Sequence, residues 1–370
     1  MINKIEINKI GRRTLYMNSI TLPLKEPLVA TYPGLSFLSA IIKNIPLGYD
    51  WLISNFIQVR GYSGNTYYWN LLPNTTPDLK DNYINAWDLC PFIRKFTISS
   101  NKMLSNYNSF TDFLISSLSN NLYVCGYLDQ YFLPRIKEPG FLHKNLIYGF
   151  DLEYKKIYLA DHFTDGKYST LSIDFDTINK SYMLANEAWI QNNLDQVYDN
   201  IFLFQLIECN YKFNIKLVTN LLKEYITSSN NYNSIYQLVN GFIDDKGKYF
   251  YGIDNYLLLQ EYLEKLSSEN NNIHKDHRMF TMLRDHKNYL KLLVDYLTSH
   301  NYIEQNETIK GSFDNLVMKA NIILNLFLKY IVCSSNKFLY TIRYKLNDIK
   351  NQEIVALSKL IEMIDANNAS

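Results

Sequence analysis

The pattern of hydrophobic and polar residues changes near residue 190. Before that point apolar residues occur in short runs, separated by the prolines and by turn residues, as in strands and short helices. After it, apolar residues recur at helical spacing, which predicts helices over residues 214–227, 256–266, 279–297, 315–332 and 351–364. We therefore expect two domains, residues 1–190 with mixed α and β structure and residues 191–370 mainly helical.

Within the first domain the pattern predicts helices before strands. Helices are expected over residues 36–43 and 50–57, after a loop at residues 30–34, and over residues 109–117. Strand-like runs follow at residues 122–132, 145–151, 156–160 and 168–173, and Asp174 is a candidate N-cap for the next helix. This order favours an α+β fold with an antiparallel sheet over an alternating βαβ fold.

One hairpin could bring chemically active side chains together. The runs at 145–151 and 156–160 flank a polar turn, and a turn centre near residue 152 or 153 sets position 143 opposite residues 161–163. His143 should therefore lie within reach of Asp161. An imidazole that faces a carboxylate is the orienting half of a nucleophilic triad, although such a pair can also simply close a sheet edge. His162 is a second candidate and could be the solvent-facing neighbour.

Composition narrows the classes of partner. Lys and Arg number 37 and Asp and Glu 36, which gives a net charge of +1, and no Lys/Arg run occurs, so we expect no nucleic-acid or anionic-membrane partner. The hydrophobic fraction of 47% excludes a disordered chain. The four cysteines form neither a disulfide framework nor a CxxC pair. His274 and His277 lie in an Asn-rich loop without metal-ligand spacing, so no metal and no cofactor are expected.

Targeting signals are also absent from the sequence. The N-terminal segment has no apolar h-region and no cleavage site of small residues. The longest apolar stretch, residues 317–333, is interrupted by polar residues at helical spacing, which indicates an amphipathic helix. We therefore expect a soluble, cytoplasmic protein, and the richness in Asn, Ile, Lys and Tyr is typical of an AT-rich bacterial genome.

The hairpin resembles a known family. The family pattern is His, strand, Gly-Tyr-Asp, turn, strand and Asp-Pro, and here it reads as His143, the run Leu146-Ile147-Tyr148-Gly149-Phe150-Asp151 and the run Ile157-Tyr158-Leu159-Ala160-Asp161. This pattern is similar to that of the N-terminal domain of butirosin biosynthesis protein H, within the papain-like fold of bacteriocin-processing peptidases. The likeness spans roughly residues 25–185, and the segment 126–134 resembles the strand that precedes the His in relatives. The resemblance implies acyl transfer through a cysteine, from a carrier-protein thioester to an amine.

The chain departs from this family where a nucleophile is expected. In that fold a cysteine opens the first helix, whose N-terminus lowers the thiol pKa. The matching segment, residues 31–41, contains no cysteine; Ser36 is the nearest hydroxyl, and a serine at a helix start is more often an N-cap. Cys125, in the strand before His143, could lie near the site, but a thiol in mid-strand is usually a core residue. The remaining candidates for substrate binding are Gly34, in the loop before the first helix, and Asp129 and Tyr131, after Cys125.

Three functions remain open. The first is acyl transfer or amide formation in peptide or thiotemplate natural-product biosynthesis, with His143 as base, Asp161 as its orienting partner, and an acyl or peptidyl carrier protein and a small amine as partners. The second is a catalytically degenerate papain-like module, a pseudoenzyme that binds a carrier protein or pathway partner. The aromatic segment Tyr62–Trp69 could supply its contacts, or could pack inside the protein. The third, a peptidase, depends most on the missing nucleophile.

Overall fold

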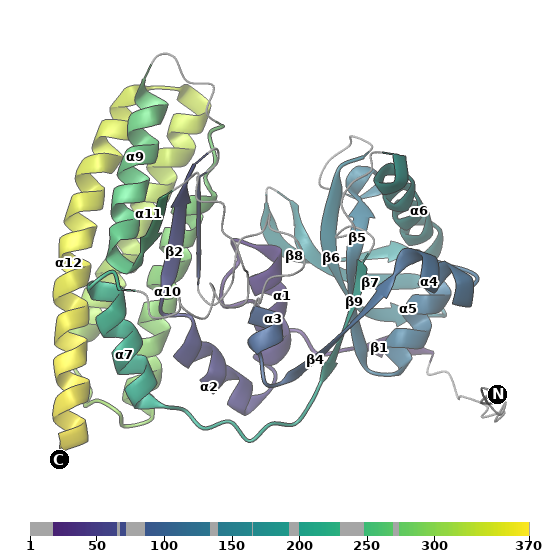
Figure 1. The fold of residues 1–370 in the computed structure, drawn as a ribbon, viewed down its shortest axis with the longest axis horizontal. Helices are drawn as coiled ribbons and strands as arrows, with labels where there is room; N and C mark the ends of the chain where they lie inside the picture. The colour runs from purple at the N-terminus through teal and green to yellow at the C-terminus, as the bar shows by residue number, and fades with distance from the viewer. Residues whose placement is uncertain are drawn as a thin grey trace, which may run out of the picture.

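The computed structural model of the protein describes residues 18–64, 67–71, 86–133, 140–164, 166–191, 200–229, 248–268 and 274–369. Within these residues a large antiparallel sheet lies beside a bundle of long helices, with three shorter helices between them (Figure 1). This arrangement confirms the predicted α+β class and the predicted helical C-terminal region.

The large sheet has the strand order β4-β9-β5-β6-β7-β8, and the short strand β1 pairs with β6. Its strands are β1 (Ser19–Thr21), β4 (Ile93–Ser99), β5 (Leu122–Asp129), β6 (Leu142–Asp151), β7 (Lys156–Thr164), β8 (Lys167–Asp174) and β9 (Asn200–Leu206). One side of the sheet carries α4 (Ser100–Asn106), α5 (Phe110–Ser119) and α6 (Phe175–Gln191), and the other side carries α1 (Pro33–Ile42) (Figure 1). Asp174 accepts a hydrogen bond from the Thr177 amide, as expected of the N-cap of α6.

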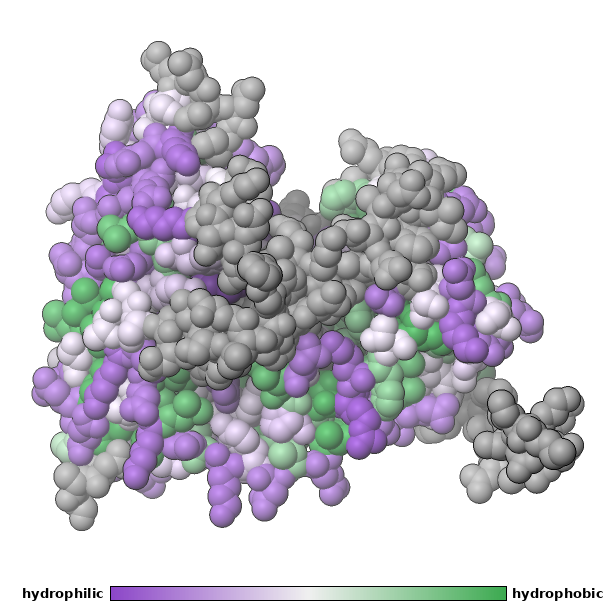
Figure 2. Space-filling model, viewed as in Figure 1, coloured by the Kyte–Doolittle hydropathy of each residue, from purple (hydrophilic) through white to green (hydrophobic). Residues whose placement is uncertain are grey.

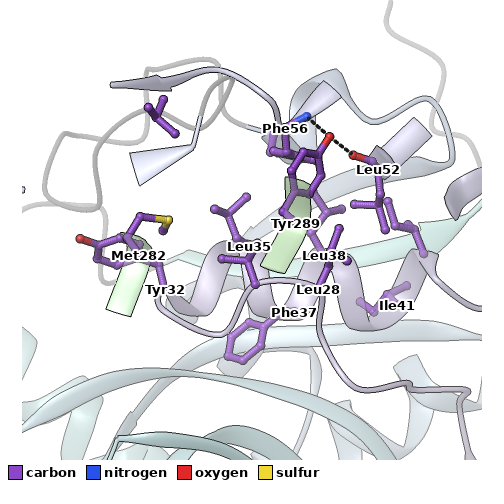
Figure 3. Close-up of a cluster of buried hydrophobic side chains, with 14 of the residues drawn as sticks. Leu28, Tyr32, Leu35, Phe37, Leu38, Ile41, Leu52, Phe56, Met282 and Tyr289 are labelled. Atoms are coloured by element: carbon purple, nitrogen blue, oxygen red, sulfur yellow. Dashed lines mark hydrogen bonds between the residues drawn. The ribbon is translucent and has the colours of Figure 1, made fainter. Parts of the chain in front are cut away.

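Helix α1 lies between the sheet and the helical bundle. Figure 3 shows Phe37 on the side of the sheet, and Leu35 and Leu38 on the side of Tyr289 from the bundle. The sequence predicted a start at residue 36, but the helix begins at Pro33, because proline presets the helical φ angle and has no N–H to leave unpaired. The next helix, α2 (Pro46–Asn55), also begins with proline. The short helix α3 (Ala86–Leu89) packs against α1.

The bundle consists of long amphipathic helices. They are α7 (Ile215–Ile226), α9 (Asn255–Ser267), α10 (Arg278–Ser299), α11 (Glu307–Cys333) and α12 (Asn336–Ala369). By length and composition alone α11 could cross a membrane, but it packs between α10 and α12. Figure 2 shows hydrophilic and hydrophobic residues mixed over the visible face of the bundle. The packing is compatible with the expected soluble protein.

The two halves of the chain share their sheets. Strand β9 follows residue 190 in the sequence, yet it lies between β4 and β5 of the large sheet. A second sheet pairs β10 (Lys248–Tyr251), from the second half, with β2 (Val59–Ser63), which pairs in turn with β3 (Tyr67–Leu71). The predicted boundary between residues 190 and 191 therefore separates strands from the sheets to which they belong.

The aromatic segment that includes β2 and β3 contacts the second half of the chain. The ring of Tyr62 lies 5.2 Å from that of Tyr249, and the ring of Tyr67 lies 5.2 Å from that of Tyr262 on α9. These two contacts favour packing inside the protein over display for a partner. Residues 65 and 66 of the segment lie outside the described part of the chain.

Candidate active site

The predicted contact between His143 and Asp161 is present. Strands β6 and β7 pair from Asp151 opposite Lys156 to Leu146 opposite Ala160, with a bulge between Ile147 and Gly149. The hairpin carries His143 near the start of β6 and Asp161 near the end of β7, as the sequence pattern indicates. The Nδ1 atom of His143 lies 2.6 Å from Oδ2 of Asp161, which is a short, charge-assisted hydrogen bond.

The electrostatics of this pair leave one imidazole nitrogen available. Burial raises the pKa of Asp161, but hydrogen bonds from His143 and His162 lower it by more, and the net pKa is below its ordinary value. An ionised carboxylate only accepts hydrogen bonds, so Nδ1 of His143 carries a proton, and Nε2 is an acceptor whenever the ring is neutral. The His143 side chain is 19% exposed, and the Phe141 ring lies parallel to it at 6.2 Å.

His162 is a second partner of the same carboxylate. Its Nε2 donates to the carbonyl oxygen of Ala30 at 2.6 Å, and its Nδ1 lies 3.3 Å from Oδ1 of Asp161. Both neighbours of the His162 ring, the Asp161 carboxylate and the Ala30 carbonyl, are hydrogen-bond acceptors. The sequence pattern offered His162 as a second candidate that could face solvent. It is only 4% exposed, because both faces of the sheet are covered here: its neighbours Ala160, Asp161 and Phe163 are buried as well.

The Ala30 carbonyl belongs to a loop that is fixed from the helical bundle. Oδ2 of Asp285, on α10, accepts hydrogen bonds from the Ala30 amide at 3.0 Å and from the Thr31 hydroxyl at 2.7 Å. The guanidinium of Arg284 holds the other carboxylate oxygen at 2.7 Å. No local sequence pattern indicates Asp285, since it lies 254 positions from Thr31 in the chain.

Ser36 does not lie in the position of a nucleophile. It is fully buried in the first turn of α1, and its hydroxyl donates to the carbonyl of Tyr32 at 2.9 Å. The nearest imidazole nitrogen is Nε2 of His162 at 3.5 Å, which is already bonded to Ala30. Gly34 lies nearby, where an added Cβ would meet only the Trp87 indole at 3.9 Å, so no steric need for glycine is evident.

Cys125 points away from the pair. It lies opposite Leu146 in the β5–β6 ladder, whereas His143 lies opposite Leu128, and the regular alternation of the strands puts Cys125 and His143 on opposite faces of the sheet. Burial raises the pKa of its thiol to about 12, so the reactive thiolate is scarce near neutral pH. Burial likewise raises the pKa of Cys90 to about 12.

Asp129 and Tyr131 occupy the turn at the end of β5. The Asp129 carboxylate is buried, and it accepts hydrogen bonds from the amides of Tyr131 at 2.9 Å and Gly140 at 2.8 Å. Both carboxylate oxygens therefore stabilise the chain before β6, which is a structural role. The Tyr131 ring is 39% exposed and lies edge-on to Phe132.

Two buried amides accompany His143. Asn145 donates to the carbonyl of His143 at 2.8 Å, and Gln130 donates at 3.3 Å to the carbonyl of Leu128, the residue opposite His143. Within the described part of the chain, the amide oxygen of each is buried without a hydrogen-bond partner. Such acceptors are costly to bury and are satisfied by a water or by an N–H or O–H group of a ligand.

A cavity of about 630 Å³ lies elsewhere, at the C-terminal end of α1 between α2 and α10. Its lining includes Lys43, Tyr49 and Tyr296 but not the His143–Asp161 pair. Among the described residues, no group of three or more His, Cys, Asp or Glu side chains is placed to hold a metal ion.

Comparison with known proteins adds no family. No protein-family model matches the chain, and no curated protein matches it. The residues themselves therefore carry the functional argument.

Proposed function

We propose that this protein transfers an acyl group from a carrier-protein thioester to a small amine, with His143 as general base. The observation that carries the proposal is the 2.6 Å bond between Nδ1 of His143 and the buried, ionised Asp161. This bond selects the tautomer in which Nε2 can take a proton, and it stabilises the imidazolium that forms. The resemblance of the hairpin to the papain-like family supports the choice of substrate class.

The proposed reaction needs no nucleophile from the protein. The amine nitrogen attacks the thioester carbonyl while Nε2 of His143 removes one of its protons, and the new C–N bond forms as the C–S bond breaks. The imidazolium then returns the proton to the departing thiolate, which leaves as a thiol. A thioester is already activated, so base catalysis and positioning suffice, which agrees with the buried thiol of Cys125 and the bonded hydroxyl of Ser36.

The buried acceptors near His143 suit an amine substrate. An amine carries N–H groups, and the unpaired amide oxygens of Gln130 and Asn145 are acceptors that such groups could satisfy. A peptidase is less well supported, because cleavage of an unactivated amide depends on the nucleophile that residues 31–41 lack.

Thioester aminolysis by the purified full chain tests the proposal. The probe is an acyl N-acetylcysteamine thioester with glycinamide as the amine, and the product amide is quantified by mass spectrometry. The substitution His143→Ala should lower the rate by about 10²–10⁴-fold, as expected for loss of a general base. His274→Ala is the matched control, because His274 is exposed and lies before α10.

The outcomes separate the candidate functions. Equal rates for the wild type and the His143→Ala variant would overturn the enzymatic proposal. In that case, retention of a carrier protein by both proteins would favour the binding module. Hydrolysis of unactivated peptides that depends on His143 would favour the peptidase.

A further inference from the structure

The bundle and the candidate site are joined through one carboxylate. Asp285 is 5% exposed, and its Oδ2 atom accepts from the Ala30 amide and the Thr31 hydroxyl, while Arg284 holds Oδ1. Hydrogen bonds to an ionised acceptor are about twice as strong as neutral ones. These bonds therefore fix the loop before α1 from a residue on α10.

The same loop residue also holds His162. The amide of Ala30 is bonded to Asp285 and its carbonyl is bonded to Nε2 of His162, so one peptide segment lies between the two side chains. A shift of this segment would move the carbonyl away from the imidazole. The bond is 2.6 Å long, so a displacement of the carbonyl by about 1 Å would take it beyond hydrogen-bond distance.

His162 in turn shares a carboxylate with His143. Nδ1 of His162 lies near Oδ1 of Asp161, and Nδ1 of His143 lies near Oδ2 of the same group. The position of His162 therefore affects both the orientation of the carboxylate and the share of its negative charge that reaches His143.

We propose that Asp285 is a positioning residue for the candidate site: through Ala30 and His162 it fixes the Asp161 carboxylate and so sets the tautomer and the basicity of His143. The inference rests on the proposed function for its catalytic meaning. The geometry it concerns can be measured without any substrate.

The test is nitrogen NMR of the imidazoles in the full chain. In the wild type, His143 should carry its proton on Nδ1 and show the unprotonated signal of Nε2 above its pKa. The Asp285→Ala substitution should shift the His143 titration relative to the wild type, because Ala30 and His162 then no longer hold the Asp161 carboxylate in place. Asp285→Asn keeps an acceptor for the loop and should give a smaller shift.

Controls exclude a general loss of structure. Asp295→Asn, on the same helix, should leave the His143 titration unchanged. If the Asp285→Ala chain does not fold, Thr31→Val removes one of the two bonds to the loop and, together with Asp285→Asn, should shift the titration in the same direction. A His143 titration in these folded variants equal to that of Asp295→Asn would overturn the inference.

The two proposals fail separately. If the wild type shows no thioester aminolysis but Asp285→Ala shifts the His143 titration, the proposed function is wrong and the positioning role stands. If aminolysis depends on His143 but neither Asp285 nor Thr31 affects the imidazole, only the positioning role is wrong.

Discussion

A single buried carboxylate, Asp161, accepts hydrogen bonds from two imidazoles, His143 and His162. Its burial would by itself raise the pKa and favour the neutral acid, and the two donors reverse that preference. The result is a fixed negative charge inside the sheet. That charge orients His143 in the proposed reaction and also contributes to stability.

The pKa of Asp161 predicts how stability depends on pH. A carboxyl group with a lowered folded pKa stabilises the native state above its unfolded pKa, and this contribution is lost as the pH falls through the folded pKa. The Asp161→Asn variant should be less stable than the wild type by about 1–3 kcal/mol at pH 7. Urea unfolding should show this difference down to about pH 4 and its decrease below. A difference that disappears between pH 7 and pH 5 would contradict the assignment.

His286 predicts a second dependence, at higher pH. Its ring is fully buried, donates to the Ile57 carbonyl at 2.9 Å, and lies 3.0 Å from the Lys287 ammonium; burial and then Lys287 lower its pKa well below the ordinary value. Below about pH 6.5 the unfolded state therefore binds a proton at this imidazole and the native state does not. The free energy of unfolding then decreases as the pH decreases, by up to about 1.4 kcal/mol per pH unit. The His286→Gln variant should lose this part of the slope in urea-unfolding series from pH 7 to pH 5. An unchanged slope would show that His286 is not the group responsible.

At the residue scale, the sequence predicted the contacts that depend on spacing within a single hairpin. A hairpin with a short turn places its two arms with small error, so His143 and Asp161 could be paired from their positions alone. The expectation that His162 could face solvent was wrong, because both faces of β7 are covered at this point and Asp161 and Phe163 are buried beside it. Asp285 could not be found, since its contact depends on how α10 packs against α1.

At the scale of elements, a buried ion pair links two helices of the bundle. Lys287 on α10 and Glu353 on α12 are fully buried and bonded to each other, and the Tyr256 hydroxyl donates to the second oxygen of Glu353 at 2.6 Å. Removing one partner of such a pair leaves an uncompensated charge in the interior. The pair therefore fixes the register of α10 against α12, because a shift of either helix would separate two buried charges.

The substitution Lys287→Met tests this role. It should lower the free energy of unfolding by about 3–5 kcal/mol, because Glu353 then remains buried without a counter-ion. Lys291→Met is the control on the same helix, since it breaks an exposed pair with Asp314 and should change the free energy by no more than about 1 kcal/mol. Equal effects of the two substitutions in urea unfolding would refute the structural role.

The extents of the long helices were less predictable than their existence. The apolar windows predicted residues 315–332 and 351–364, whereas α11 begins at Glu307 and α12 at Asn336. The side chain of Asn306 accepts from the Ile309 amide and so starts α11 a full eight residues early. The missed turns also carry buried side chains at helical spacing, Ile309 and Phe313 on α11 and Leu339, Ile342 and Leu346 on α12, so the predicted windows were too short.

For the whole molecule, the shared sheets imply that the two halves fold together. Strand β9 completes the large sheet between β4 and β5, and β10 completes the small sheet beside β2. The sequence predicted the fold class and most helices, because these follow from local periodicity. It could not predict which distant strands pair. The predicted boundary therefore follows the change in hydrophobic pattern near residue 190, although β9 and β10 pair with strands from before that boundary.

A fragment of residues 1–190 tests this integrity. It lacks β9, so the edges of β4 and β5 would be exposed. Tyr123 and Trp87, which contact Phe204 of β9 in the full chain, would be exposed as well. We expect it to aggregate or to give poorly dispersed amide NMR signals, whereas the full chain gives a dispersed spectrum. A well-dispersed, monomeric fragment would show that residues 1–190 form an independent domain.

The central claim is that His143 and Asp161 act as one unit in acyl transfer. Rates of thioester aminolysis for the wild type, His143→Ala, Asp161→Asn and the double variant measure this most directly, since groups that act together lose their effects non-additively. We predict that the double variant is no slower than His143→Ala alone, because Asp161 acts only through His143. Losses that multiply in the double variant, or rates unchanged in all three variants, would contradict the account.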